Sequence, residues 1–214
     1  MRIGVLGTGR VGTTLGSGFL ELGHEVVLGS RDRHNPRLLA WVETSGRRAA
    51  GGTFAEAADF GELLVLAIHG TAAESTLATC RKGDLAGKVL VDTTNPLDFS
   101  QGFPPRLAFG HTDSAGERVQ RAVGTGRVVK AFNTVSSVHM VRPRFPGGPP
   151  SMFICGNDAA AKSTVATLCC DLGWGVVDVG DIAAARYLEP MCLVGFLHGA
   201  RSGRWNHAFK MLEC

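Results

Sequence analysis

The chain starts with a short apolar run that ends in a glycine-rich turn. Residues 1–12 read MRIGVLGTGRVG, in which Gly7, Gly9 and Gly12 have the spacing G-x-G-x-x-G. Between a strand and a helix, the first glycine of this pattern permits a tight turn, the second lets a ligand approach the backbone, and the third lets helix and strand pack closely. The chain is therefore predicted to begin with the strand, turn and helix of a parallel α/β fold.

Strand-like and helix-like stretches then alternate almost to the end of the chain. The predicted strands are RIGVL (2–6), EVVLG (25–29), RRAAGG (47–52), LLVLAI (63–68), KVLVD (88–92) and RVVKAF (127–132). Apolar residues at helical spacing predict a helix over 11–22, and further helices are expected over 36–44, 71–80 and 115–123. This alternation is typical of a Rossmann fold, a doubly wound parallel sheet that helices cover on both faces.

The residues after the second predicted strand indicate which dinucleotide the glycine turn would bind. Free N–H groups and partial positive charge at a helix N-terminus favour phosphate groups. An acidic residue about 20 positions further on would hold the ribose 2′-hydroxyl of NAD, but Ser30 and Arg31 stand there. Since a hydroxyl and a guanidinium both donate hydrogen bonds to phosphate oxygens, we expect NADP, with Arg33 as a second contact. Asp32 leaves the alternative of a contact with the ribose of NAD open.

A proline- and glycine-rich stretch divides the chain. Residues 142–150 (RPRFPGGPP) contain four prolines and two glycines, which excludes a helix interior or a central strand. We expect residues 1–141 to form a dinucleotide-binding Rossmann domain, 142–150 a loop, and 151–214 a small C-terminal α/β extension packed on that domain. Strands at 151–156 and 175–180, a helix at 158–172 and a helical stretch from residue 182 are predicted in the extension.

Charge, cysteine spacing and hydropathy argue against several classes of protein. The net charge is only +3 and the basic residues are scattered, so no nucleic-acid surface is indicated. The longest apolar run, residues 191–197, is far shorter than the ~20 residues of a membrane span, and it is expected in the core or at a subunit interface. The six cysteines lack metal-site spacing. With no signal peptide visible, we expect a cytoplasmic protein without a metal site.

Four further motifs accompany GTGRVG: GSRD at 29–32, DTTNPL at 92–97, KAFNTV at 130–135 and ARYLEP at 185–190. Together they resemble the family of NADPH-dependent F-420 reductases, that is, coenzyme F-420-dependent NADP oxidoreductases and their bacterial relatives, over nearly the whole chain. The resemblance implies a homodimer that moves a hydride between NADPH and a deazaflavin or flavin. The fold also resembles the cytoplasmic domain of the six-transmembrane ferric reductases.

The resemblance also implies places for individual residues. Residues Thr8, Gly9, Arg10 and Val11 would lie along the pyrophosphate, and Ser30, Arg31 and Arg33 around the 2′-phosphate. Ile68 and His69 end the fourth strand, where the cofactor would pass toward its nicotinamide. The nicotinamide and the second redox ring would be framed by Asn95, Pro96, Ala131, Phe132 and Asn133.

Several polar side chains keep two interpretations. Asn95 and Asn133 each offer a donor and an acceptor to the nicotinamide amide, although Asn95-Pro96 is also an ordinary turn start. His69 is a weak candidate for a general acid, or else a packed or capping residue. Basic residues that would attract the acidic tail of F-420 or form a solvated face are Lys130, Arg142 and Arg144. Glu189-Pro190 is expected to mark the start of the last helix.

No catalytic triad, metal cluster or pair of carboxylates is visible in the sequence. Hydride transfer fits this pattern, because it requires two stacked rings and little else from the protein. Two alternatives stay open. One is an NADPH-dependent reductase of a small carbonyl, imine or alkene, with His69 as proton donor. The other is a non-catalytic, NADPH-binding redox sensor.

Overall fold

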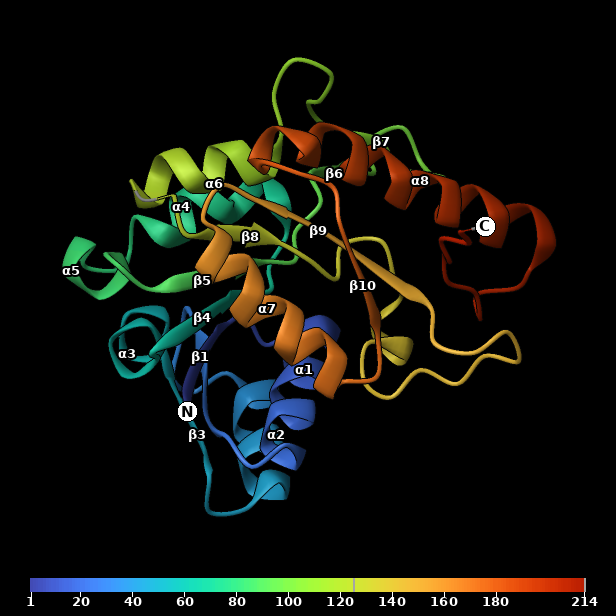
Figure 1. Cartoon of the computed structure of the whole chain (residues 1–214). Coiled ribbons are helices and arrows are strands. Elements are labelled where there is room, and N and C mark those ends of the chain that lie inside the picture. Colours follow the sequence, from blue (N-terminus) through green and yellow to red (C-terminus); the bar gives the residue numbers. More distant parts are fainter. Residues whose placement is uncertain (125, 214) are drawn as a thin grey trace.

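The computed structural model describes residues 1–124 and 126–213, and it is built around one mostly parallel sheet (Figure 1). Eight strands form the sheet in the order β10-β9-β8-β5-β4-β1-β2-β3. They are β1 (Arg2–Leu6), β2 (Glu25–Ser30), β3 (Ala49–Thr53), β4 (Leu63–Leu66), β5 (Val89–Asp92), β8 (Val128–Lys130), β9 (Ser151–Gly156) and β10 (Gly175–Asp178). Only the β8–β9 pair is antiparallel among these neighbours.

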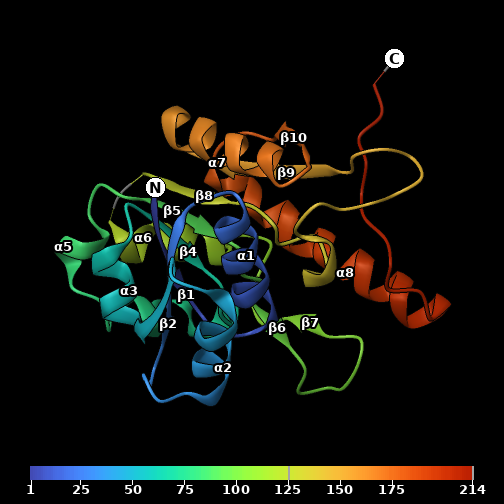
Figure 2. The same cartoon turned by 90° about the horizontal axis from the view of Figure 1, so that it is seen from below.

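Helices cover both faces of the sheet (Figures 1 and 2). One core cluster lies under α1 (Arg10–Glu21), α2 (Pro36–Ser45) and α7 (Ala159–Asp171). The other lies under α3 (Phe54–Phe60), α4 (Ala73–Leu77), α5 (Lys82–Leu85), α6 (Ala115–Val123) and α8 (Ala185–Ser202). Three 3-10 turns, Gly70–Ala72, Ser137–His139 and Ile182–Ala184, and the short hairpin β6 (Leu97–Asp98) and β7 (Arg106–Leu107) complete the described elements.

The order of the first six strands confirms the predicted Rossmann fold. From one edge the strands follow 3-2-1-4-5-8, so the chain reverses its direction across the sheet between β1 and β4. In open α/β sheets a ligand crevice forms at such a reversal, outside the carboxyl ends of the strands. The fold therefore places the glycine turn after β1 and the residues after β4 on the two sides of one crevice.

The C-terminal part continues this sheet and both core clusters. Val129 and Lys130 of β8 pair with Gly156 and Cys155 of β9, and residues of β9 contribute to the clusters on both faces. The segment after α8 returns along the same strand, since the Ser151 amide donates to the Phe209 carbonyl at 2.9 Å. The boundary at 142–150 stays a prediction, because the extension shares one sheet with the rest of the chain.

Two elements differ from the sequence prediction in length. The expected helix 71–80 is a 3-10 turn followed by α4, because bonds from Thr79 and Cys80 to carbonyls three residues back tighten and end the helix after Leu77. The final helix α8 already begins at Ala185 and carries Pro190 in its interior. Among the described residues, no helix is long and apolar enough to cross a membrane.

Candidate active site

The glycine turn between β1 and α1 has the close contacts that its spacing predicts. A Cβ at Gly7, where φ is 139°, would lie 2.1 Å from the Ala67 carbonyl oxygen, and a Cβ at Gly12 would lie 2.1 Å from that of Gly7. At Gly9, by contrast, an added Cβ would meet nothing within 4 Å. Gly9 is also the N-cap of α1 and provides no side-chain cap. The start of α1 therefore faces open space, as a phosphate site requires.

A cavity of about 760 Å³ extends from this turn across the carboxyl ends of the strands. Ten of the predicted site residues line it: Gly7, Thr8, Gly9, Arg10, Val11, Ser30, Arg31, Ile68, His69 and Asn95. The prediction did not include Asn35, Phe54 or the lining residues in and just after α4, among them Ser75, Thr76 and Thr79. Five of the predicted cofactor-binding residues, Gly12, Arg33, Pro96, Ala131 and Asn133, lie outside this lining.

The residues after β2 separate into two environments. Ser30 is buried and Arg31 is exposed, and both face the cavity. Arg33 instead forms an ion pair with Glu56, at the start of α3. The Asp32 carboxylate accepts a hydrogen bond from the His34 amide at 2.9 Å, which commits it to a local turn. Arg31 is therefore the cationic side chain of this segment that faces the cavity.

Asn95 and Asn133 are joined by hydrogen bonds. The Asn133 side-chain amide donates to Asn95 Oδ1 at 3.0 Å and to the Leu188 carbonyl at 2.9 Å, while the Asn95 amide donates to the Asn133 carbonyl at 2.7 Å. Asn133 Oδ1 is buried, and no hydrogen-bond partner for it occurs in the described part of the chain. The pair thus holds the loop after β5 against the loop after β8 and leaves one acceptor unused.

A second cavity of about 300 Å³ adjoins the first. Both cavities are lined by Val11, Thr93, Asn95 and Leu97. The far walls of the smaller cavity include Asn133, which the sequence predicted at the site. They also include residues that the sequence did not connect with it, among them Met140, Cys192, Phe196, Trp205 and His207. Phe196 contacts Phe99, Phe103 and Trp205 at centroid distances of 6.5, 6.0 and 6.2 Å. Of these rings, Phe196 and Trp205 line the smaller cavity and give it an apolar surface suited to a flat ring.

His69 lies in the larger cavity and Lys130 lies in neither. Nδ1 of the exposed His69 is 2.8 Å from the Thr71 hydroxyl oxygen, as expected for a residue that precedes a helical turn. Lys130 is fully buried, with Nζ 2.9 Å from Asp92, 2.8 Å from Glu189 and 2.7 Å from the Thr94 carbonyl. The predicted role of Lys130 in attracting an acidic tail is therefore wrong. Its charge is neutralised inside the protein, and it holds the loop that lines both cavities.

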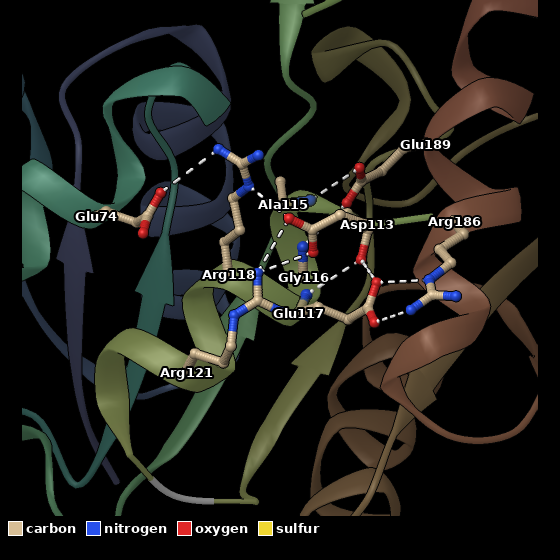
Figure 3. Close-up of polar contacts among 10 residues, drawn as sticks. Glu74, Asp113, Ala115, Gly116, Glu117, Arg118, Arg121, Arg186 and Glu189 are labelled. Carbon is tan, nitrogen blue, oxygen red and sulfur yellow. Dashed lines mark hydrogen bonds and ion pairs between the residues drawn. The ribbon is translucent and has the colours of Figure 1, made fainter. Parts of the chain in front are cut away.

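Glu189 is also not the start of a helix. Its two carboxylate oxygens accept hydrogen bonds from the Ala115 and Gly116 amides, each at 3.0 Å, at the N-terminus of α6 (Figure 3). Burial alone would lower the pKa of Lys130, but the negative charges of Asp92 and Glu189 outweigh burial and raise it. α8 is thereby fixed to β8 and to α6 by one buried carboxylate.

A second group of charges surrounds the same end of α6. Arg186 donates two hydrogen bonds to Glu117, at 2.9 and 2.6 Å, and Asp113 accepts bonds from Arg118 and Arg121 (Figure 3). The hydrogen bonds from Arg186 hold the pKa of Glu117 below its usual range. These contacts support the position of α8, whose next turns form a wall of the smaller cavity.

Comparison with known proteins identifies the family. The model of the family described as "NADP oxidoreductase coenzyme F420-dependent" matches residues 2–96. The F420-dependent NADP reductase of Methanothermobacter thermautotrophicus is 36% identical over 202 residues, which cover 89% of this chain and 86% of that protein. The chain belongs to the F420-dependent NADP reductase family. This is an oxidoreductase family, and the resemblance seen in the sequence motifs is confirmed.

Two further relatives agree with this family. A crystal structure of a candidate F420-dependent NADP-reductase from Arthrobacter sp. FB24 is 41% identical and covers 99% of both chains, with a TM-score of 0.92. The metalloreductase STEAP3 of Rattus norvegicus is 32% identical over 195 residues, which are 90% of this chain and 36% of that protein. The chain therefore spans about a third of the length of this relative.

Proposed function

We propose that the protein transfers a hydride between NADP(H) and a deazaflavin such as coenzyme F-420, or a flavin. One observation carries the proposal: the two cavities adjoin, since Val11, Thr93, Asn95 and Leu97 line both of them. A donor ring at the end of the larger cavity would meet an acceptor ring in the smaller one. Membership of the F420-dependent NADP reductase family supports this pairing.

The larger cavity would hold NADP(H) in an extended form. The pyrophosphate would lie on the free amides at the start of α1, and the 2′-phosphate beside Ser30 and Arg31. The nicotinamide would then lie near Asn95, beyond the strand end at Ile68 and His69. The chain itself would determine the position of the bound NADP(H). Close backbone contacts hold the glycine turn, and Lys130 holds the loop after β5.

The smaller cavity would hold the second ring. Its walls carry apolar and polar side chains, and the ring cluster around Phe196 and Trp205 offers edges and faces for stacking. Such a site orients two flat rings and excludes water, which is the main requirement of a direct hydride transfer. The bound cofactor supplies the redox chemistry, and the protein supplies the geometry.

The test is an anaerobic absorbance assay of the purified protein. NADPH or NADH is mixed with F-420, FMN or FAD, and absorbance is followed at 340 nm (the NADPH band) and at the acceptor band. NADPH-selective bleaching of F-420 or a flavin supports the proposal. NADPH oxidation only with small carbonyls, imines or alkenes would favour the alternative reductase. NADPH binding without turnover on any acceptor would favour the redox sensor.

Self-association is a separate part of the proposal. We propose a homodimer, supported by the family resemblance and by apolar side chains that α8 exposes at helical spacing: Tyr187 (78% exposed), Val194 (54%) and Leu197 (55%). In Figures 1 and 2 the C-terminal half of α8 extends beyond the sheet. Sedimentation equilibrium should give a dimer for the natural chain and a monomer for Val194→Lys. A monomeric natural chain would exclude the dimer.

A further inference from the structure

The segment after α8 brings a histidine into the smaller cavity. His207 lines this cavity together with Trp205. The segment is held in place two residues later, because the Phe209 carbonyl accepts a hydrogen bond from the Ser151 amide at 2.9 Å, and the Met211 amide donates to Ser151 Oγ at 3.0 Å. His207 is thus carried by an anchored stretch of chain, and its imidazole has a defined position at the cavity wall.

The imidazole of His207 packs against α8 with one nitrogen unsatisfied. A Cβ at Gly195 would lie 3.0 Å from Nε2, so the glycine is what lets the ring approach the helix so closely. The ring of His198 lies at a centroid distance of 4.9 Å. Nδ1 is buried and, within residues 1–124 and 126–213, has no hydrogen-bond partner. A buried polar nitrogen without a partner usually indicates a missing water, ion or ligand.

No other described side chain that lines this cavity is suited to proton transfer near neutral pH. The lining contains two titratable side chains in the described part of the chain, Cys192 and His207. Burial raises the pKa of the Cys192 thiol to about 12, so it does not exchange a proton readily at neutral pH. Imidazole is the side chain that ordinarily gains and loses a proton in the physiological range. His69 lies in the larger cavity and does not line the smaller one.

We propose that His207, which lines the smaller cavity, is the proton donor of the reduction and acts on the acceptor ring there. This inference rests on the proposed function. It assigns a catalytic residue outside the cofactor motifs, on the segment that follows the last helix. It also replaces His69, the weak candidate of the sequence analysis, as the general acid.

The reaction balances with one proton from His207. The C4–H bond of the dihydronicotinamide breaks, and its hydrogen and both electrons form a new bond to the central ring of the deazaflavin or flavin. NADPH becomes NADP⁺, and the added electron pair makes a conjugated ring nitrogen of the acceptor basic. That nitrogen takes the proton from the imidazolium of His207, which is left neutral and recovers a proton from water. In the reverse direction neutral His207 accepts the proton.

The test compares His207→Gln with His198→Gln in the full-length protein. His207→Gln keeps a side chain of similar size that donates hydrogen bonds, but it removes the acid. We expect kcat for F-420 or flavin reduction by NADPH to fall at least about 100-fold, with the Kd for NADPH unchanged within about twofold. His198→Gln, which removes the neighbouring ring but no cavity-lining group, should keep kcat within about twofold.

The pH profile provides a second readout. The titratable groups near His207 are His198 on α8, His139, whose pKa is lowered by burial and then by the charge of His207, and the Cys192 thiol. In the natural chain and in His198→Gln, kcat for reduction should fall at high pH as the donor loses its proton. In His207→Gln this decline should disappear. Added imidazole should restore part of the activity of His207→Ala.

The possible outcomes separate the role of His207 from the proposed function. If the natural chain reduces F-420 or flavin and His207→Gln keeps both its kcat and its decline at high pH, the role of His207 is wrong while the proposed function stands. If both variants lose activity equally, the effect is one of packing and the role is also wrong. If the natural chain oxidises NADPH with neither acceptor, the proposed function and the inference fail together.

Discussion

Lys130 and Glu189 form an ion pair of 2.8 Å, with side-chain exposures of 0% and 1%. The two residues belong to β8 and α8, and the same carboxylate accepts the first amides of α6. Lys130 also binds the Thr94 carbonyl in the loop that lines both cavities. One buried pair therefore links the cofactor side of the site to the helix that carries the wall of the smaller cavity.

Replacing Lys130 by methionine should strongly destabilise the protein. The substitution leaves Asp92 and Glu189 buried without their cation, and breaking a buried ion pair from one side costs about 3–5 kcal/mol. Urea denaturation measures the loss in the free energy of unfolding. Arg2→Met, which removes a half-exposed ion pair with Glu62, is the control and should cost far less. Equal losses in the two variants would contradict the central place of Lys130.

Substitutions at two glycines of the turn should affect different properties, one the stability of the fold and the other the affinity for NADPH. In Gly12→Ala the new Cβ meets the Gly7 carbonyl oxygen, so helix and strand are forced apart and stability should fall by about 1–3 kcal/mol. In Gly9→Ala the Cβ points into open space, so stability should change by less than about 0.5 kcal/mol. The methyl group would instead stand where the pyrophosphate approaches the backbone. NADPH affinity of Gly9→Ala should drop at least about tenfold, which calorimetry can measure; an unchanged affinity would place the phosphates elsewhere.

Arg31 should determine the preference for NADPH. One charge-assisted hydrogen bond contributes ~1.5–3 kcal/mol, so Arg31→Ala should weaken NADPH binding about ten- to a hundredfold and leave NADH binding nearly unchanged. Titration of tryptophan fluorescence gives both dissociation constants. Arg33→Ala serves as the comparison, and its effect should be smaller because Arg33 is paired with Glu56. A similar weakening of NADPH and NADH in Arg31→Ala would refute the assignment.

Stability should decline in acid partly through Glu117. Its pKa is lowered in the folded protein, chiefly by hydrogen bonds from Arg186, so its contribution is complete above its ordinary pKa of 4.5. The contribution is lost as the pH falls below 4.5 and through the lower pKa of the folded state. Glu117→Gln should therefore destabilise the protein at pH 7 and flatten this acid decline. Glu43→Gln, at an exposed position of α2, is the control. Parallel pH profiles for Glu117→Gln and the natural chain would disprove the role of this pair.

The cofactor half of the site was predictable because its residues lie in contiguous motifs. The glycine spacing determines the turn, and Ser30 and Arg31 stand at the end of β2. The positions of these residues therefore depend only on neighbouring residues in the sequence. The prediction went wrong at Lys130, where a basic residue was interpreted as a surface charge. Its two carboxylate partners, Asp92 and Glu189, are distant in the sequence. The pairing of β8 with β5 brings Asp92 to Lys130, and the packing of α8 brings Glu189.

The smaller cavity was not predictable in the same way. Its lining residue Phe196 comes from α8, and Trp205 and His207 come from the segment after that helix. Phe99 and Phe103, which contact Phe196, come from the β6–β7 connection. Each of these residues alone is an ordinary aromatic or histidine, in a helix or in an irregular stretch. Gly195 leaves room for the His207 ring, and this role depends on how the last segment returns to α8.

Direct transfer of deuterium tests the central claim, that the donor and acceptor rings meet where the two cavities adjoin. The purified protein is incubated anaerobically with F-420 and with NADPH that carries deuterium at C4 on one face or on the other, and the reduced deazaflavin is analysed by mass spectrometry. The account predicts that deuterium from one of the two labelled forms appears in the product, on the carbon that accepts the hydride. A reduced product without deuterium from either form would contradict it.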